Sequence, residues 1–252
     1  MKKLENRTVI VTGAASGMGK AISILFAAEG ANVVLADLKQ NEIDQVVNSI
    51  IQEGGKAIGV VCNVANESDI KTVIDTTIKK FTTLDILINN AGVMDDFMPI
   101  DSVTNELWNH VMDVNLNGPF YMCRLTIPIM LKQENGVIIN IASVGGLYGS
   151  RAGLAYTASK HALIGLTKNI GFMYAKKGIR CNAIAPGGVN TNIGKNMQPN
   201  KFGYERCVSG GGNMPRTGEA DEIAKTALFL ASKDSSFING AVITADGGWT
   251  AY

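Results

Sequence analysis

The sequence predicts an α/β protein built on a doubly wound, mostly seven-stranded parallel sheet with helices on both faces. Short runs rich in β-branched residues alternate along the chain with longer amphipathic segments, which is the pattern of strands followed by helices. The strand-like runs are continuously apolar rather than alternating, as expected when both faces of a parallel sheet are covered. Parallel strands separated by helices require crossover connections, which are right-handed.

The elements can be assigned in order from their apolar runs and from the glycines that end them. Strands are predicted at residues 8–12, 32–36, 57–62, 85–89, 136–142, 179–185 and 241–244, and helices at 17–29, 40–53 and 67–80. Gly30 ends the first helix, and Gly54 with Gly55 ends the second, because glycine readily takes the conformation that follows a helix.

Nothing in the sequence divides the chain into separate domains. There is no internal repeat and no linker rich in Pro, Ser or charge, so we expect one domain over residues 1–252. Residues 187–218 are rich in glycine and lack a strong periodicity. Irregular segments of this length in a compact domain are usually functional, which predicts a substrate lid, with flexibility in the glycine run 210–212.

Composition and charge exclude several classes of function. The 252 residues include 23 Lys or Arg and 22 Asp or Glu, a net charge of +1. No basic run is longer than two lysines, so we expect no nucleic acid and no membrane among the partners. The chain also has no long apolar run and no signal-peptide pattern.

The cysteines and histidines do not form a metal-binding pattern. The four cysteines are widely spaced, without a C-x-x-C pair, and only two histidines are available. This spacing predicts neither structural zinc nor a disulfide framework, and reduced thiols are typical of the cytoplasm. We therefore expect a cytoplasmic protein without a bound metal.

A glycine-rich turn, Thr12-Gly13-Ala14-Ala15-Ser16-Gly17-Met18-Gly19, joins the first predicted strand to the first helix. At this position the free N–H groups of the helix N-terminus favour a phosphate, and glycine lets the backbone approach it. The spacing is G-x-x-x-G-x-G, which matches neither the triphosphate-binding P-loop nor the G-x-G-x-x-G pattern. Taken alone, the turn is consistent with a pyrophosphate site or with a purely structural role.

An acidic residue strengthens the interpretation as a dinucleotide site. Asp37 stands at the end of the second predicted strand, about 20 residues after the last glycine of the loop. A carboxylate there accepts hydrogen bonds from an adenosine ribose and repels a 2′-phosphate, which favours NAD over NADP. Lys39 nearby leaves some use of NADP open.

Tyr156 and Lys160 are a candidate proton-transfer pair. They are spaced i, i+4, so in a helix both side chains lie on one face. A free phenol has a pKa of about 10, and a neighbouring ammonium stabilises the phenolate and lowers that pKa. The pair could therefore exchange a proton with an alcohol or carbonyl oxygen.

Together these motifs resemble those of the short-chain dehydrogenase/reductase family over essentially the whole chain. The matched patterns are the Rossmann-type cofactor loop at 12–19, N-N-A-G at 89–92, a tetrad of Asn115, Ser143, Tyr156 and Lys160, Pro186-Gly187 with Thr191, and Asp246-Gly247-Gly248. Each pattern is modestly specific by itself, and their occurrence in register makes the resemblance specific.

The resemblance implies a role for each member of the tetrad. Tyr156 would exchange the proton with the substrate oxygen, and Ser143 would polarise that oxygen through a hydrogen bond. Lys160 would hold the nicotinamide ribose and favour the tyrosinate, while Asn115 would position a water that links Lys160 to solvent. Hydride would pass directly between the nicotinamide and the substrate carbon.

The resemblance also implies where the cofactor binds. The expected contact residues are Gly13, Ser16, Gly17, Met18, Gly19, Asp37, Asn63, Val64, Asn90, Ala91, Gly92, Tyr156, Lys160, Pro186, Gly187, Val189 and Thr191. One position departs from the family pattern: Asn63-Val64 stands where the family usually has Asp-Val, so the adenine contact of Asn63 is open. A homotetramer is implied as well, with residues 241–252 near a subunit boundary.

The leading hypothesis is an NAD-preferring oxidoreductase that interconverts a small secondary alcohol and a ketone. One alternative is a 3-oxoacyl-acyl-carrier-protein reductase using NADPH, which Ser16 and Asp37 disfavour. The other is a non-catalytic dinucleotide-binding regulatory protein, against which the complete tetrad argues. Asp95 and Asp96, which follow the N-N-A-G motif, are expected in a solvent-exposed loop, and a place at the mouth of the pocket is the alternative.

Overall fold

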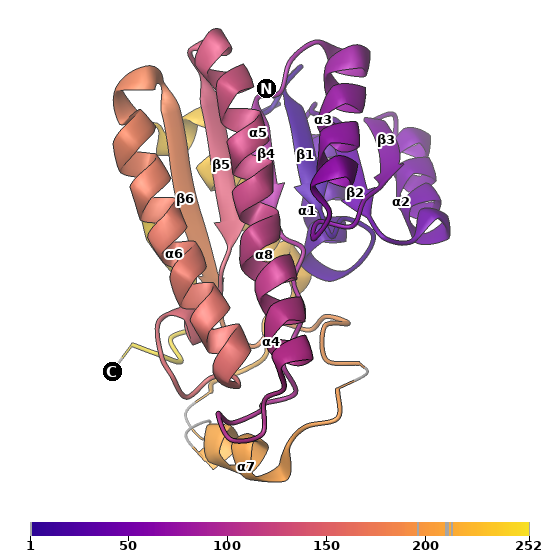
Figure 1. Cartoon of the computed structure of the whole chain (residues 1–252). Coiled ribbons are helices and arrows are strands. Elements are labelled where there is room, and N and C mark those ends of the chain that lie inside the picture. Colours follow the sequence, from indigo (N-terminus) through magenta and orange to yellow (C-terminus); the bar gives the residue numbers. More distant parts are fainter. Residues whose placement is uncertain (1, 196, 210–211, 213, 252) are drawn as a thin grey trace.

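Seven parallel strands form one sheet in the order β3-β2-β1-β4-β5-β6-β7 (Figure 1). They are β1 (Thr8–Thr12), β2 (Asn32–Asp37), β3 (Lys56–Val61), β4 (Ile86–Asn89), β5 (Gly136–Ile141), β6 (Ile179–Pro186) and β7 (Val242–Ala245). The structure, a computed structural model, describes residues 2–195, 197–209, 212 and 214–251. The predicted parallel sheet is confirmed, and each predicted strand end lies within one residue of the observed end.

Helices cover both faces of the sheet. One face carries α1 (Gly17–Ala28), α2 (Gln40–Gln52) and α8 (Ala220–Ala231), and the other carries α3 (Glu67–Phe81), α5 (Gly118–Gln133) and α6 (Leu154–Tyr174). α4 (Asn105–Met112) continues into α5 through a π-helical turn, Asp113–Asn117, and α7 (Lys201–Ser209) lies beyond the sheet (Figure 1). Short 3-10 turns occur at Val144–Gly146, Ala175–Lys177 and Lys233–Ser235.

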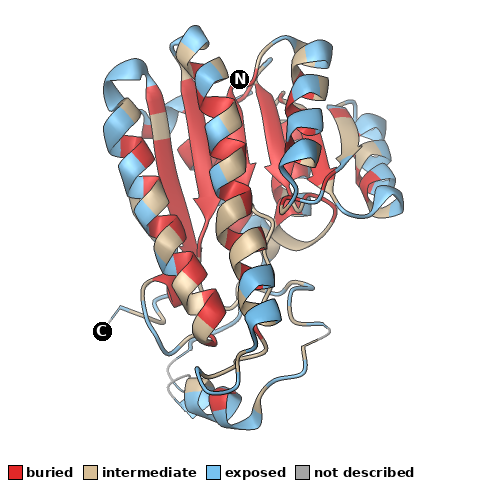
Figure 2. Ribbon diagram, viewed as in Figure 1, coloured by how far each residue is buried: buried red, intermediate tan, exposed pale blue. Residues whose placement is uncertain are grey.

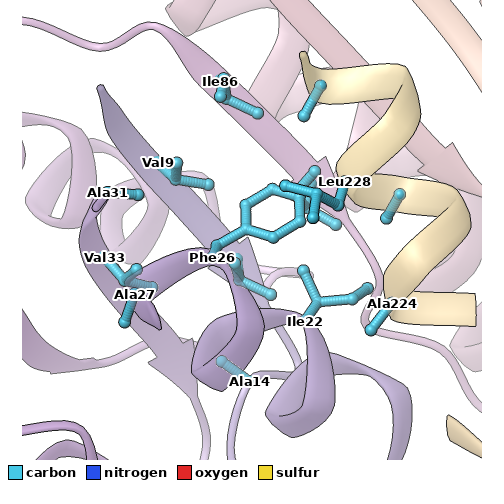
Figure 3. Packing of buried hydrophobic residues seen from close by; sticks show 14 of the residues in the cluster. Val9, Ala14, Ile22, Phe26, Ala27, Ala31, Val33, Ile86, Ala224 and Leu228 are labelled. Carbon is cyan, nitrogen blue, oxygen red and sulfur yellow. The ribbon is translucent and has the colours of Figure 1, made fainter. Parts of the chain in front are cut away.

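The continuously apolar strands supply two separate cores. Val9 and Val11 of β1 pack with α1 and α8 on one face, whereas Ile10 between them packs on the opposite face, because successive strand residues point in opposite directions. Phe26 of α1 fills the first core beside Leu228 of α8 (Figure 3). The inner strands are buried along their length (Figure 2), while the edge strands β3 and β7 are partly exposed.

Local signals explain where several helices begin. The side chain of Asn66 accepts the backbone N–H of Ser68 and caps α3, whose first turn is acidic and whose last turn holds Lys79 and Lys80. α8 begins with a reciprocal capping box between Glu219 and Glu222. These caps satisfy backbone groups that a helix end otherwise leaves without partners.

The segment 187–218 contains a helix that the sequence analysis did not assign. Its two ends pair through a single bridge between Val189 and Gly218, and α7 lies between them. The strands point their carboxyl ends toward this segment (Figure 1). Within the predicted glycine run, residues 210 and 211 lie outside the described part of the chain.

The four cysteines are unpaired thiols. Cys62, Cys123 and Cys181 are buried, and Cys207 is partly exposed. Burial raises the pKa of the Cys62 and Cys123 thiols to about 12, so both stay protonated. Among the described residues, no group of His, Cys, Asp or Glu side chains could hold a metal ion. None of the described helices is long and apolar enough to cross a membrane.

Candidate active site

The glycine loop between β1 and α1 has the shape of an anion cradle. Gly13 and Gly17 have φ values of +61° and +50°, a left-handed conformation that glycine takes without steric cost. The side chain of Ser16 does not cap α1, and the first turn of α1 holds no acidic residue. The positive end of the helix is therefore available to an anion such as a pyrophosphate.

Residues that follow β4 hold this loop in place. The amide nitrogen Nδ2 of Asn90 donates to the carbonyl oxygens of Thr12 (2.9 Å) and Gly13 (3.0 Å). In return, Oγ1 of Thr12 accepts the backbone N–H groups of Asn90 (3.0 Å) and Ala91 (3.1 Å). These bonds shape the crevice between β1 and β4, where the strand order reverses and ligands of doubly wound sheets bind.

Gly19→Ala is expected to disrupt the cradle. A Cβ on Gly19 would overlap the carbonyl oxygen of Gly13 and approach Nδ2 of Asn90 to 2.5 Å, so the loop would have to move. We expect a loss of about 1–3 kcal/mol in the free energy of unfolding and much weaker NAD binding by fluorescence titration. Gly149→Ala is the control, since its Cβ would meet nothing within 4 Å. Unchanged NAD affinity in Gly19→Ala would contradict the prediction.

The two predicted adenosine-side residues differ in their surroundings. Asp37, the last residue of β2, lies beside the glycine loop: its Oδ2 accepts the N–H of Ala15 at 2.9 Å. Asn63, just after β3, is exposed, and its Oδ1 accepts the N–H of Ala65 at 3.0 Å in a local turn. Val64 next to it is buried. The structure thus brings Asp37 to the cradle, whereas the side chain of Asn63 bonds within its own turn.

Tyr156 and Lys160 lie on α6, and both side chains are buried. Nζ of Lys160 stands 5.5 Å from the centroid of the Tyr156 ring and donates to the carbonyl oxygen of Ile141 at 2.9 Å. Burial lowers the pKa of Lys160 to about 8, because a buried ammonium loses its hydration. The pair therefore occupies the shared helix face that its spacing predicts.

The direction of the Tyr156 pKa corrects the expectation from the sequence. Burial raises the pKa of the phenol, a hydrogen bond with Ser143 lowers it, and the charge of Asp95 raises it further. The net change is upward, so burial outweighs the groups that favour the phenolate in the chain alone. The lowered pKa expected from the lysine spacing is wrong for the protein without its cofactor.

Ser143 is held next to the phenol by the turn that follows β5. Its hydroxyl hydrogen-bonds Tyr156, and its Oγ accepts the N–H of Gly145 at 3.0 Å. A Cβ on Gly145 would lie 3.4 Å from the Tyr156 ring, and one on Gly146 would lie 2.7 Å from the carbonyl oxygen of Lys160. The two glycines allow this turn to pack closely against α6.

Asn115 lies in the π-helical turn between α4 and α5 and is fully buried. Its Oδ1 accepts the N–H of Val93 at 2.8 Å, and its Nδ2 donates to the carbonyl oxygen of Val93 (2.9 Å) and to Oγ of Ser159 (3.2 Å). The side chain thus ties the segment after β4 to α6. π-Helical turns are rare in proteins overall, and those that occur are often found at functional sites. The water-positioning role of Asn115 stays a prediction.

The segment that follows β6 returns to the glycine loop. The N–H of Gly187 donates to the carbonyl oxygen of Ala245 at 3.1 Å. Farther along, Thr191 reaches Gly17, where an added Cβ would lie 3.2 Å from Cβ of Thr191. Of the residues predicted to contact the cofactor from this segment, Thr191 therefore lies against the cradle.

Asp95 has contacts with α6 that the sequence did not predict. The predicted solvent-exposed loop is wrong for this residue, which is fully buried; Asp96 is partly buried. The carboxylate of Asp95 accepts the backbone N–H groups of Gly153 (3.1 Å) and Tyr156 (2.9 Å), which are 58 and 61 residues away. Burial raises the pKa of Asp95, and these N–H groups oppose the shift. No local sequence pattern signals a contact over such a separation.

Known proteins share this arrangement. A family model described as enoyl-(acyl carrier protein) reductase matches residues 13–250. The 3beta-hydroxysteroid dehydrogenase 2 of Eggerthella lenta is 43% identical over 251 residues, which cover 99% of this chain and 96% of that protein. The 3-oxoacyl-acyl-carrier-protein reductase of Thermotoga maritima is 39% identical over 248 residues, or 98% of each protein.

Solved structures agree with the sequence relatives. The crystal structure of levodione reductase matches with a TM-score of 0.91 at 33% identity, covering 99% of this chain and all of the other. Fold, motifs and relatives therefore coincide over nearly the whole length. The chain belongs to the short-chain dehydrogenase/reductase family, whose members are NAD(P)-dependent oxidoreductases acting on alcohols and ketones.

Proposed function

We propose that this oxidoreductase prefers NAD and uses Tyr156 to move the proton between a secondary alcohol and a ketone. The observation that carries the proposal is the grouping around one buried phenol, which is hydrogen-bonded to Ser143 and faces the ammonium of Lys160. A donor, a polarising hydroxyl and a fixed cation are the groups that an alcohol–carbonyl interconversion needs.

The residues present fit a nicotinamide dinucleotide. The loop with Gly13, Gly17 and Gly19 leaves room that any Cβ would fill, and the helix end behind it is open to a pyrophosphate. Asp37 would hold the adenosine ribose, and Thr191 the carboxamide end. When bound, the nicotinamide supplies the acceptor or donor of the hydride.

The protein's own residues handle the proton. In the oxidation direction, the phenolate of Tyr156 accepts the proton of the alcohol while Ser143 donates a hydrogen bond to the oxygen that becomes a carbonyl. Because burial raises the pKa of Tyr156, the phenolate requires a fixed positive charge nearby. Lys160, with a pKa of about 8, supplies that charge at neutral pH.

The activity is tested by mixing the protein with NAD and a panel of secondary alcohols and following the absorbance of the reduced nicotinamide. We expect turnover of a cyclic alcohol such as a 3β-hydroxysteroid, because the Eggerthella lenta relative carries that activity in its name. Met197 and Met214 contact Gly194 and Gly188 in the segment 187–218, and we propose that these adaptable side chains line an apolar substrate pocket. Absence of turnover with every alcohol and both cofactors would contradict the proposal.

A second candidate is reduction of a 3-oxoacyl thioester with NADPH. This candidate is supported by the Thermotoga maritima relative, which is named as such a reductase and is 39% identical over 98% of each protein. The same assay run in reverse separates the two candidates. Faster oxidation of NADPH by a 3-oxoacyl thioester than turnover of any alcohol or ketone would favour this second function.

Asp37→Ala is expected to shift the cofactor preference from NAD toward NADP. The variant loses a carboxylate that accepts ribose hydroxyls and repels a 2′-phosphate, so we expect KM for NAD to rise about 10- to 100-fold. Lys39 can then face a phosphate, although its ammonium pairs with Glu42 at 2.8 Å. Asp44→Ala is the control, an exposed aspartate in α2 bonded to Gln40. Equal use of NAD and NADP by the wild type would refute the preference.

We further propose that residues 187–218 act as the substrate lid of a single-domain enzyme. The lid is supported by its position beyond the carboxyl ends of the strands and by the contact of Thr191 with the glycine loop (Figure 1). A cytoplasmic location is supported by the four free cysteines.

A homotetramer is the assembly we propose. It is supported by large apolar side chains that stand exposed on this chain, among them Phe120 on α5, Phe172 and Met173 on α6, and Phe237 before β7. Light scattering measures the mass of the assembly directly. A monomer at micromolar concentration would contradict the proposal.

A further inference from the structure

A buried carboxylate caps the helix that carries the catalytic pair. Asp95 is fully buried in the loop after β4, and among the described residues it forms no ion pair. Its two oxygens accept the N–H groups of Gly153 and Tyr156 instead. A carboxylate in this setting has its charge stabilised by backbone dipoles rather than by a cation.

The N–H of Tyr156 belongs to the first turn of α6, and that of Gly153 belongs to the residue just before this helix. Such groups have no partner within a helix and are usually satisfied by Ser, Thr, Asp or Asn at the preceding position. Here that position is Gly153, which has no side chain to offer, and the first turn holds no acidic residue. The cap is therefore supplied from outside the helix, and one of the two capped groups is the backbone of Tyr156 itself.

We propose that Asp95 is a positioning residue for Tyr156: it sets where the phenol stands by holding the first turn of α6. The proposal rests on the function assigned above to Tyr156. Catalysis of proton transfer depends on this placement, since a displacement of about 1 Å can cost about a hundredfold in rate.

Gly153 shows how closely the carboxylate is seated. A Cβ added there would lie 2.6 Å from both oxygens of Asp95. The backbone of Gly153 has φ −75° and ψ −176°, a conformation open to any residue. The glycine is therefore required by the close approach of Asp95 and its loop, and not by the conformation of the chain.

The loop that carries Asp95 is itself held in a strained form. Asp96 and Phe97 have φ values of +53° and +55°, unusual for residues other than glycine. Oδ1 of Asp96 accepts the N–H of Gln198 at 3.2 Å, and its carbonyl oxygen accepts the N–H of Asn200 at 2.8 Å. Strain of this kind persists only where surrounding contacts impose it, and it clusters at functional sites.

The same loop joins the proposed lid to the catalytic helix. On one side, Gly203 of α7 packs directly on the carbonyl of Phe97, and the Tyr204 ring meets the Phe97 ring edge-on at 5.3 Å. On the other side, the N–H of Leu154 in α6 donates to the carbonyl oxygen of Met98 at 3.0 Å. The loop of Asp95 is thus held by α7 as well as by α6.

The charge of Asp95 gives the proposal a distinctive readout. The charged groups near the phenol are Lys160 of α6 and the Asp95 carboxylate; Asp95 in turn lies near Cys207 of α7, whose other charged neighbours are Arg151 and Arg206. Of these acidic and basic groups, the carboxylate is the one that raises the pKa of Tyr156 through its charge. Removing the charge while keeping the shape should therefore lower the pKa of the phenol.

Asp95→Asn makes that change. We expect kcat for alcohol oxidation to fall about 10- to 100-fold, since an amide can accept only one of the two N–H groups and presents its own N–H₂ to the other. NAD affinity should stay at the wild-type value. The acid limb of the pH profile of kcat/KM should move to lower pH. Without any cofactor, amide hydrogen exchange in peptides covering residues 153–157 should become faster.

Asp85→Asn is the matched control. Asp85 is also a buried carboxylate beside β4, at the opposite end of the strand, where it accepts the N–H of Thr8 at 2.9 Å and pairs with Arg7 at 2.7 Å. Its variant should lose thermal stability and exchange faster near Thr8. Asp85→Asn should have the wild-type kcat and the wild-type acid limb of the kcat/KM profile. Amide hydrogen exchange in residues 153–157 should also be as in the wild type.

The proposal is overturned if Asp95→Asn leaves the acid limb or the exchange of residues 153–157 at wild-type values. If that variant does not fold, Gly153→Ala tests the same contact from the other side, and wild-type kcat and exchange there would overturn it equally. Failure of the proposed function has a different signature. The wild type would then show no turnover, while the exchange measurement would still report whether Asp95 holds the helix.

Discussion

Tyr156→Phe is expected to lower kcat by about 10²- to 10⁴-fold, the range that a positioned acid–base group contributes. The substitution removes only the phenol oxygen, which is the atom that Ser143 contacts and that exchanges the proton in the proposed function. The phenyl ring keeps its place beside Gly145, so the walls of the site do not change. Steady-state kinetics with NAD and the best alcohol from the panel measure the loss.

Binding and stability should respond far less than turnover in this variant. NAD affinity should stay near the wild-type value because the cradle lies in another part of the site. The free energy of unfolding should change by about 1 kcal/mol, the usual value of one hydrogen bond. Tyr174→Phe, at the far end of the same helix, is the control and should keep full turnover. Turnover in Tyr156→Phe equal to that in Tyr174→Phe would remove Tyr156 from the mechanism.

Lys160→Met is expected to lose turnover and to gain stability at neutral pH. Turnover falls because the buried phenolate loses the cation that stabilises it, by at least about 10²-fold. Stability rises because the folded wild type must keep an ammonium out of water, which lowers the pKa of Lys160 from 10.5 to about 8. The pKa difference corresponds to a penalty of roughly 3 kcal/mol for burying the ammonium, which the variant does not carry. The variant loses about 1 kcal/mol with the hydrogen bond to Ile141, so the net effect is stabilising.

The sign of the pH dependence follows from the same shift. Between pH 8 and 10.5 the unfolded chain binds more protons at Lys160 than the folded chain does, so the stability of the wild type rises with pH relative to the variant. The advantage of Lys160→Met is therefore complete below pH 8 and disappears as the pH approaches 10.5. Thermal unfolding of the cofactor-free proteins at both ends of this window measures it.

Lys168→Met provides the comparison for this experiment, because Lys168 is an exposed lysine on the same helix. It should keep wild-type turnover and should not show the stabilisation. A Lys160→Met protein that is less stable than the wild type at pH 7 would show that the buried ammonium is stabilised by more than its single bond to Ile141.

The strands could be read from the sequence because their signal is local. The runs around Val9, Val33 and Ile86 are apolar without interruption, and their neighbours on each face proved to be different helices. Some helices were harder to predict than the strands. α5 is apolar around most of its circumference and contains Pro119 and Pro128, so it lacks the one-sided pattern that marks an amphipathic helix.

α7 was not predicted from the sequence for a different reason. It is a short helix inside a glycine-rich segment, and its Gly203 and Tyr204 pack on Phe97, about a hundred residues earlier in the chain. Short helices are marginal on their own and depend on tertiary packing. The local helix propensity of residues 187–218 was therefore too weak a signal to predict α7.

The sequence by itself determined the sheet, the glycine cradle and the pairing of Tyr156 with Lys160, because these depend on spacing along the chain and on the regular periods of strands and helices. Only the tertiary structure decided that Asp95 is buried against α6, that Asn115 is bound to Val93, and that the pKa of Tyr156 goes up rather than down. Burial and desolvation arise from segments that meet only in the folded chain, so no spacing rule could assign them.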